Sequence, residues 1–78
     1  MSWITVPEHL EKEFTFQNFE EALIFVNEVG KLAESMNHHP DISLYSYKHV
    51  RLKLTSHDKG HVTDKDRQMA DKIEQIHQ

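Results

Sequence analysis

The sequence contains no cysteine, only two glycines and two prolines, and no long hydrophobic run. Without cysteine, the chain cannot be a disulfide-stapled domain and cannot offer thiolates to zinc. Its longest apolar run, residues 22–26, is far shorter than the roughly 20 residues that a membrane-spanning helix requires. The first residues also lack the basic and then apolar stretches of a signal peptide. We therefore expect no membrane association and a cytoplasmic location.

Length and charge exclude further classes. The chain has 78 residues, 13 of them acidic and 9 basic, and a net charge of −4. We expect no direct binding to nucleic acid, because a protein that binds the phosphate backbone is normally basic. Residues 1–78 are predicted to form a single domain, since domains contain roughly 100–200 residues. A chain this short buries only about 60% of its unfolded surface, so an oligomer would enlarge a thin core.

Apolar periodicity in the first half predicts two strands and a helix. Residues 3–6 and 10–16 are β-branched, aromatic or alternating, which is typical of strands. Asn18 followed three residues later by Glu21 is a capping-box pattern that marks the start of a long helix. The helix should end before Pro40. Its expected inner stripe is Phe19, Ala22, Leu23, Val26, Val29, Ala33 and Met36.

The second half predicts two more strands and a helix. Residues 42–47 form a strand with polar breaks, and residues 50–54 alternate cleanly between apolar and polar. Thr63 and Asp66 form a second capping-box pattern at the start of a final amphipathic helix. The order strand, strand, helix, strand, strand, helix indicates an α+β fold, with a four-stranded antiparallel sheet and the helices packed on one face.

Seven histidines are a large number for this length, and four of them fall in two predicted loops. His38 and His39 follow the long helix, and His57 and His61 follow the alternating strand. Histidine is the side chain most easily poised to exchange protons near neutral pH. Two histidine loops that leave the ends of a helix and a strand therefore suggest acid–base chemistry.

Each candidate also has a plainer interpretation. Glu34 can be an exposed helix residue, Asp66 is already explained by the helix cap, and Tyr47 can simply fill a strand. The spacing of His57 and His61, four residues apart, also allows a metal site. The segment between them reads as a loop rather than a helix, so we favour acid–base chemistry and expect no bound metal.

Together these residues resemble the signature of a known family. That signature starts with a charged residue, three further residues and His-His-Pro, and continues with an aromatic residue, a histidine and a closing aspartate. The sequence matches it with residues 34–40 (ESMNHHP), Tyr47, His57 and Asp66. Flanking segments match as well, so nearly the whole chain resembles the pterin-4a-carbinolamine dehydratase family.

The resemblance implies a 4a-hydroxytetrahydrobiopterin dehydratase, a hydro-lyase that removes the 4a-hydroxyl group as water. Its product is quinonoid dihydropterin, in the recycling of tetrahydropterin. No metal or organic cofactor is implied, and members form homodimers and often homotetramers. The site residues implied are, for catalysis, His38, His57 and His39 and, for substrate binding or support, Glu34, Tyr47 and Asp66. Within this set, His38 and His57 would exchange protons, and His39 would hold the pterin ring.

The sequence also departs from the family pattern. The usual N-terminal helix is expected to be missing, and the loop after His57 reads Lys59-Gly60-His61 rather than two glycines and an apolar residue. Two alternatives stay open. One is a non-catalytic dimerisation module that acts like a transcription cofactor through the long helix. The other is a divergent member that acts on a different pterin.

Overall fold

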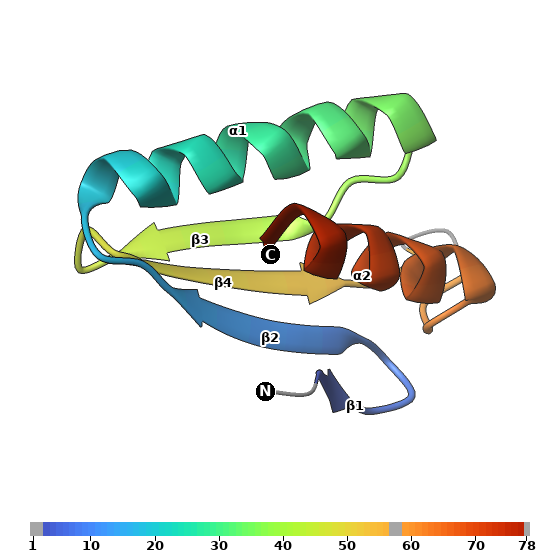
Figure 1. Ribbon diagram of the computed structural model, residues 1–78. Helices are drawn as coiled ribbons and strands as arrows, with labels where there is room; N and C mark the ends of the chain where they lie inside the picture. Colours follow the sequence, from blue (N-terminus) through green and yellow to red (C-terminus); the bar gives the residue numbers. More distant parts are fainter. Residues whose placement is uncertain (1–2, 57–58, 78) are drawn as a thin grey trace.

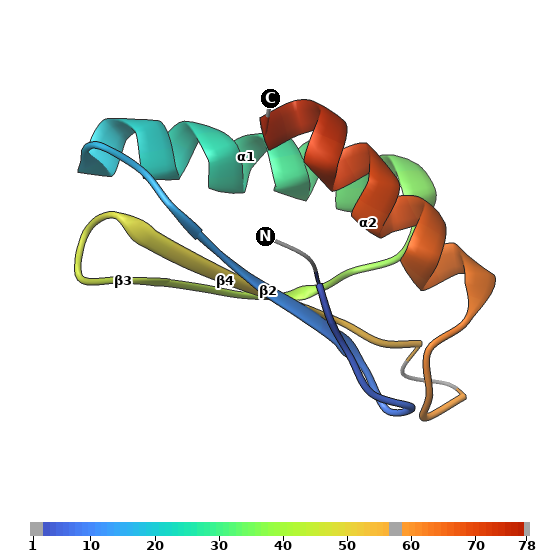
Figure 2. The same cartoon turned by 60° about the horizontal axis from the view of Figure 1, so that its bottom comes forward.

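Two helices cover one face of a four-stranded antiparallel sheet in the computed structural model, which describes residues 3–56 and 59–77 (Figures 1 and 2). The strands lie in the order β1-β2-β4-β3. The predicted α+β architecture is confirmed. The elements are β1 (Ile4–Thr5), β2 (Leu10–Thr15), α1 (Phe19–Met36), β3 (Asp41–Tyr45), β4 (His49–Leu54) and α2 (Asp64–His77).

The two central strands supply the sheet side of the core. β2 pairs with β4, so that Phe14 lies opposite Val50 and Leu10 lies opposite Leu54. These four side chains and Leu52 are buried. The predicted alternation along β4 is therefore confirmed, because successive side chains of a strand point to opposite faces. Both helices lie on the apolar face, and in the described chain no helix covers the other face (Figure 2).

α1 begins as the capping box predicts. The side chain of Asn18 accepts a hydrogen bond from the backbone N–H of Glu21 at 2.8 Å. The carboxylate of Glu21 in turn accepts one from the backbone N–H of Gln17 at 3.2 Å. The Glu21 N–H, which has no partner inside the first turn, and the Gln17 N–H just before the cap are satisfied in this way.

The predicted inner stripe of α1 was partly wrong. Phe19 and Leu23, expected to face inward, are 49% and 40% exposed. Phe25, which the stripe omitted, is buried, and its ring centroid lies 4.9 Å from that of Phe14 and 5.0 Å from that of Phe16. At 3.6 residues per turn, positions 19 and 23 lie about 120–160° around the axis from position 25. Burying the large ring of Phe25 therefore turns both of them outward.

α2 carries its apolar stripe where the sequence predicts it. The buried side chains of this helix are Asp66, Met69, Ala70 and Ile73. The helix lies beside α1 over the sheet (Figure 1), and Ile76 extends the apolar stripe as a partly buried residue. Within the described residues, neither helix is long and apolar enough to cross a membrane.

A partly buried ion pair, which the sequence pattern did not reveal, connects α2 to the sheet. Lys12 lies among the apolar residues of β2 with 8% of its surface exposed, and its Nζ bonds to the Oε1 atom of Glu74. The indole N–H of Trp3 donates to the same oxygen at 3.0 Å. The hydrogen bond from Lys12 is the main cause that holds the pKa of Glu74 below its usual range. Glu74 therefore joins α2, β2 and the segment before β1.

Replacing Glu74 by alanine should destabilise the fold by about 2 kcal/mol, because the buried ammonium of Lys12 loses its partner. Urea denaturation measures this loss. The control is Glu28→Ala, which removes an exposed pair with Lys31 on α1 and should cost less than about 0.5 kcal/mol. Equal small effects of both variants would show that the Lys12–Glu74 pair does not stabilise the fold.

The strand predicted over residues 42–47 was too long at its end. β3 stops at Tyr45, and Ser46 and Tyr47 have φ angles of 47° and 55°. Such left-handed angles at successive positions are typical of tight hairpin turns. Neither Ser46 nor Tyr47 is among the residues with the strongest preference for these angles, so the sequence pattern could not mark the turn.

Candidate active site

The end of α1 places His38 in contact with the first turn of α2. Asn37 caps the helix in the left-handed conformation, with a φ angle of 50°. The backbone N–H of His38 then donates to the carbonyl of Ala33 at 3.1 Å, which fixes the direction in which the chain leaves the helix. The imidazole Nε2 atom lies 2.5 Å from Oδ1 of Asp66. Two predicted site residues 28 positions apart are thus brought into direct contact.

Asp66 is a fully buried carboxylate whose two oxygens are both hydrogen-bonded. Oδ1 meets His38, while Oδ2 accepts from the Ser56 hydroxyl at 2.9 Å and the Thr63 backbone N–H at 2.9 Å. Burial alone would raise the pKa of this carboxyl. The hydrogen bonds from Thr63, His38 and Ser56 together outweigh burial and hold the pKa below its usual value. Asp66 is therefore ionised at neutral pH.

A cavity of about 450 Å³ lies next to this pair. Its size falls in the range of roughly 300–1,000 Å³ that is typical of small-molecule sites. All of its lining residues are polar or charged: Asn37, His38, Ser56, Lys59, Thr63 and Lys65. His38 thus contacts a buried anion and also lines a space that a small molecule can enter.

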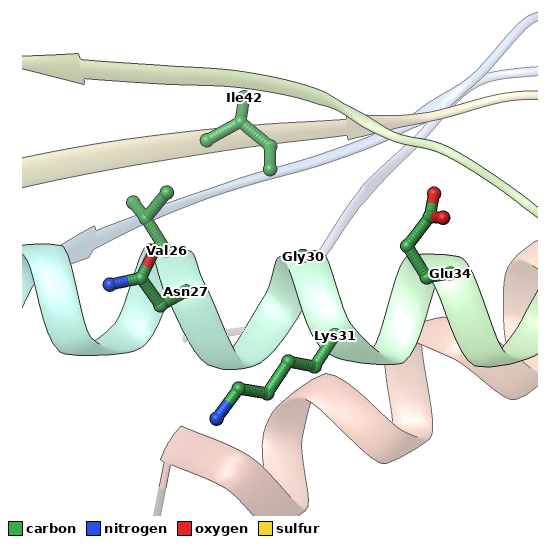
Figure 3. Close-up of a pocket in the computed structure, with 6 residues that line it drawn as sticks. All are labelled: Val26, Asn27, Gly30, Lys31, Glu34 and Ile42. Atoms are coloured by element: carbon green, nitrogen blue, oxygen red, sulfur yellow. The ribbon is translucent and has the colours of Figure 1, made fainter.

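His39 and Glu34 form a second pair away from this cavity. Nε2 of His39 lies 2.5 Å from Oε2 of Glu34, and the two side chains are 56% and 78% exposed. Glu34 lines a different hollow of about 690 Å³ between α1 and β3, together with Gly30 and Ile42 (Figure 3). The sequence motif therefore divides in space: His38 contacts α2, whereas the pair of His39 and Glu34 lies on the side of β3.

Tyr47 lies far from His38 within one copy of the chain. β3 begins beside the end of α1 and runs away from it, so the β3–β4 turn lies at the opposite end of the sheet (Figure 1). Tyr47 is in this turn and is 58% exposed. Within one copy of the chain, the hairpin therefore does not bring Tyr47 to the cavity that His38 lines, and its assignment to substrate binding stays a prediction.

His57, the remaining candidate, lies outside the described residues. The nearest described residues before and after it, Ser56 and Lys59, both line the cavity next to His38. Sequence reasoning missed Ser56, whose hydroxyl bonds to Asp66, and the signal available for it was its position directly before His57. Among the described residues, no group of three histidine, aspartate or glutamate side chains is arranged to hold a metal ion.

A family model described as pterin 4 alpha carbinolamine dehydratase matches residues 1–76. The chain belongs to the pterin-4a-carbinolamine dehydratase family. Relatives named "Putative pterin-4-alpha-carbinolamine dehydratase" include one from Sulfurisphaera tokodaii, which is 45% identical over 95% of this chain and 78% of its own length. Another, from Koribacter versatilis, is 47% identical over 87% of this chain and 71% of its own length.

Solved structures share the dehydratase fold. The structure of a transcriptional coactivator/pterin dehydratase from Brucella melitensis matches with a TM-score of 0.87 and 32% identity, over 95% of this chain and 80% of that one. A pterin dehydratase-like protein, identified as a RuBisCO assembly factor in the α-carboxysome, matches with a TM-score of 0.73. It is 20% identical, over 92% of this chain and 82% of that one, and its likeness shows the fold alone.

Proposed function

We propose that this protein is a 4a-hydroxytetrahydropterin dehydratase in which His38 and His57 exchange protons with the substrate. The observation that carries the proposal is the position of His38, with Nε2 on the ionised, buried Asp66 and the ring beside a cavity. A carboxylate in contact with an imidazole fixes the orientation of the ring and the nitrogen that carries hydrogen. Family membership supplies the substrate class.

The reaction needs one proton donor and one proton acceptor. The bond between C4a and the hydroxyl oxygen breaks, and the oxygen leaves as water once an acid has protonated it. A base removes the proton on N5, and the electron pair of that N–H bond forms the double bond between N5 and C4a. An imidazole can fill either role near neutral pH, and each well-placed group contributes about 10²–10⁴-fold in rate.

His39 and Glu34 are assigned to holding the pterin ring rather than to proton transfer. His39 directly follows His38, and its exposed side chain pairs with Glu34 rather than with Asp66, which supports this division of roles. His39→Ala should raise KM about 10-fold and change kcat by less than about 3-fold. The reason is that it removes a contact that binds the substrate and the transition state equally well. Steady-state kinetics test this prediction. The control is His49→Ala at the hairpin end of the sheet, and a large fall in kcat for His39→Ala would contradict the assigned role.

The proposed assembly is a homodimer or homotetramer of this single domain. β1 and β3 are the edge strands of the described sheet, and α1 exposes Phe19, Leu23 and Ile24, the last with 56% of its surface. Unpaired edges and exposed apolar side chains both favour association. Sedimentation equilibrium distinguishes dimer, tetramer and monomer. A monomer at micromolar concentration would contradict this proposal.

The same exposed apolar residues of α1 favour one alternative function, a binding module that pairs with another protein through α1. Dehydratase activity separates the two functions. A well-folded protein that forms a stable complex with a partner and does not accelerate dehydration would favour the binding module. Acceleration that depends on His38 would favour the enzyme.

A further inference from the structure

The two oxygens of Asp66 have different partners. Oδ1 faces His38, at 2.5 Å from Nε2. Oδ2 accepts from Ser56 and from the backbone N–H of Thr63, each at 2.9 Å, and the Thr63 hydroxyl lies 3.4 Å away. With Oδ2 occupied from two directions, the carboxylate cannot rotate without losing hydrogen bonds. Oδ1 therefore stays oriented toward the imidazole of His38.

Ser56 is itself held rigidly at the end of β4. Its backbone N–H donates to the carbonyl of His61 at 3.3 Å, and its carbonyl accepts from the N–H groups of Lys59 and Gly60 at 2.9 and 2.8 Å. Its side chain is buried, with 5% of the residue exposed. The hydroxyl also lies 2.7 Å from that of Thr63, so both hydroxyls act together on Asp66. The hydroxyl of Ser56 is thus held in place, and its hydrogen bond orients the carboxylate of Asp66.

This arrangement determines which nitrogen of His38 carries hydrogen. An ionised carboxylate can only accept hydrogen bonds, so Nε2 must donate to it. The described residues provide no hydrogen-bond partner for the other nitrogen, Nδ1. Because Asp66 occupies Nε2, Nδ1 is the ring nitrogen that remains for another contact. Because His38 lines the cavity, Nδ1 is the nitrogen available to a bound molecule.

We propose that Ser56 is a positioning residue, which holds Asp66 so that His38 keeps its hydrogen on Nε2 and exchanges protons with the substrate through Nδ1. The step at the substrate rests on the proposed function. The state of the imidazole does not, because it follows from contacts within the chain. In the neutral form, Nδ1 accepts the proton of N5, and in the protonated form, Nδ1–H can deliver a proton to the leaving oxygen.

Nitrogen-15 NMR of His38 tests the proposal directly in the full-length protein. At a pH where the ring is neutral, the wild-type spectrum should show a hydrogen on Nε2 and a bare Nδ1. In Ser56→Ala, Asp66 loses a donor to its ionised form, so its pKa should rise and the two tautomers of His38 should mix. Ser56→Thr keeps the hydroxyl and should restore the wild-type tautomer. Ser35→Ala, which removes a serine hydroxyl bonded to the carbonyl of Leu32, should change nothing.

Kinetics give a second readout. Ser56→Ala should lower kcat about 10-fold with a change in KM of less than about 3-fold, and Ser56→Thr should recover most of the loss. A wild-type spectrum with hydrogen on Nδ1 would overturn the proposal without any variant. A Ser56→Ala protein that matches Ser35→Ala in tautomer and kcat would also overturn it. If the tautomers respond as expected while the wild type does not catalyse dehydration, the positioning role stands and the proposed function fails.

Discussion

Replacing His38 by alanine should lower kcat for dehydration by about 10²–10⁴-fold, because the reaction loses a proton carrier in contact with the substrate. The fold should survive, since Ser56 and Thr63 still donate to the carboxylate of Asp66. Stopped-flow absorbance measures the rate, and circular dichroism checks the fold. His38→Gln provides a second variant whose amide can still donate to Asp66 but which cannot exchange protons.

The matched control for this prediction is His9→Ala. His9 is also a partly buried histidine beside a carboxylate, with Nε2 at 3.5 Å from Oε1 of Glu11, but it lies in the connection between β1 and β2. Its removal should leave kcat within about 3-fold of the wild type. If His38→Ala and His38→Gln both retain the wild-type rate, His38 is not a proton carrier, and the site must be sought elsewhere.

Replacing Asp66 by alanine should destabilise the fold by about 3 kcal/mol, the largest loss expected from a single polar side chain here. The change leaves the Ser56 hydroxyl, the Thr63 backbone N–H and the His38 ring without their acceptor in a buried place. Urea denaturation at neutral pH measures the loss. The control is Asp64→Ala, which removes an exposed carboxylate that pairs with Arg67 and should cost less than about 1 kcal/mol.

The contribution of Asp66 should also depend on pH. Its pKa in the folded state lies below the usual value, so its ionised form stabilises the fold above the unfolded pKa of about 3.9. That stabilisation is lost as the pH falls through the folded pKa. The stability of the wild type should therefore fall towards that of Asp66→Asn in acid. A constant difference between the two from pH 7 to pH 2 would contradict the assignment of this pKa.

Periodic features of the sequence were sufficient for most of the fold. The alternation at Val50, Leu52 and Leu54 and the capping pair of Asn18 and Glu21 both depend on neighbours in the chain, and both are confirmed. Phe25 was missed because the choice of buried face depends on which aromatic rings meet across the core. Residues at short range cannot supply that information.

The candidate site was predictable only in part, for the same reason. The proximity of His38 and Asp66 agrees with the family signature, because each sits at a helix terminus that its own local sequence defines. The position of Tyr47 was not predictable, since a tight turn with two left-handed residues decides where it lies. Lys12 gave no pattern, and Ser56 gave only its position directly before His57. Their partners, Glu74 and Asp66, are distant in sequence and adjacent only after folding.

The most direct test of the account is the dehydration of a freshly generated 4a-hydroxytetrahydropterin, followed by absorbance with and without the protein. We expect the wild type to accelerate dehydration above the spontaneous rate. We also expect this acceleration to disappear in a well-folded variant that carries both His38→Ala and His57→Ala. Absence of acceleration by the wild type, or full acceleration by the double variant, would contradict the proposed function.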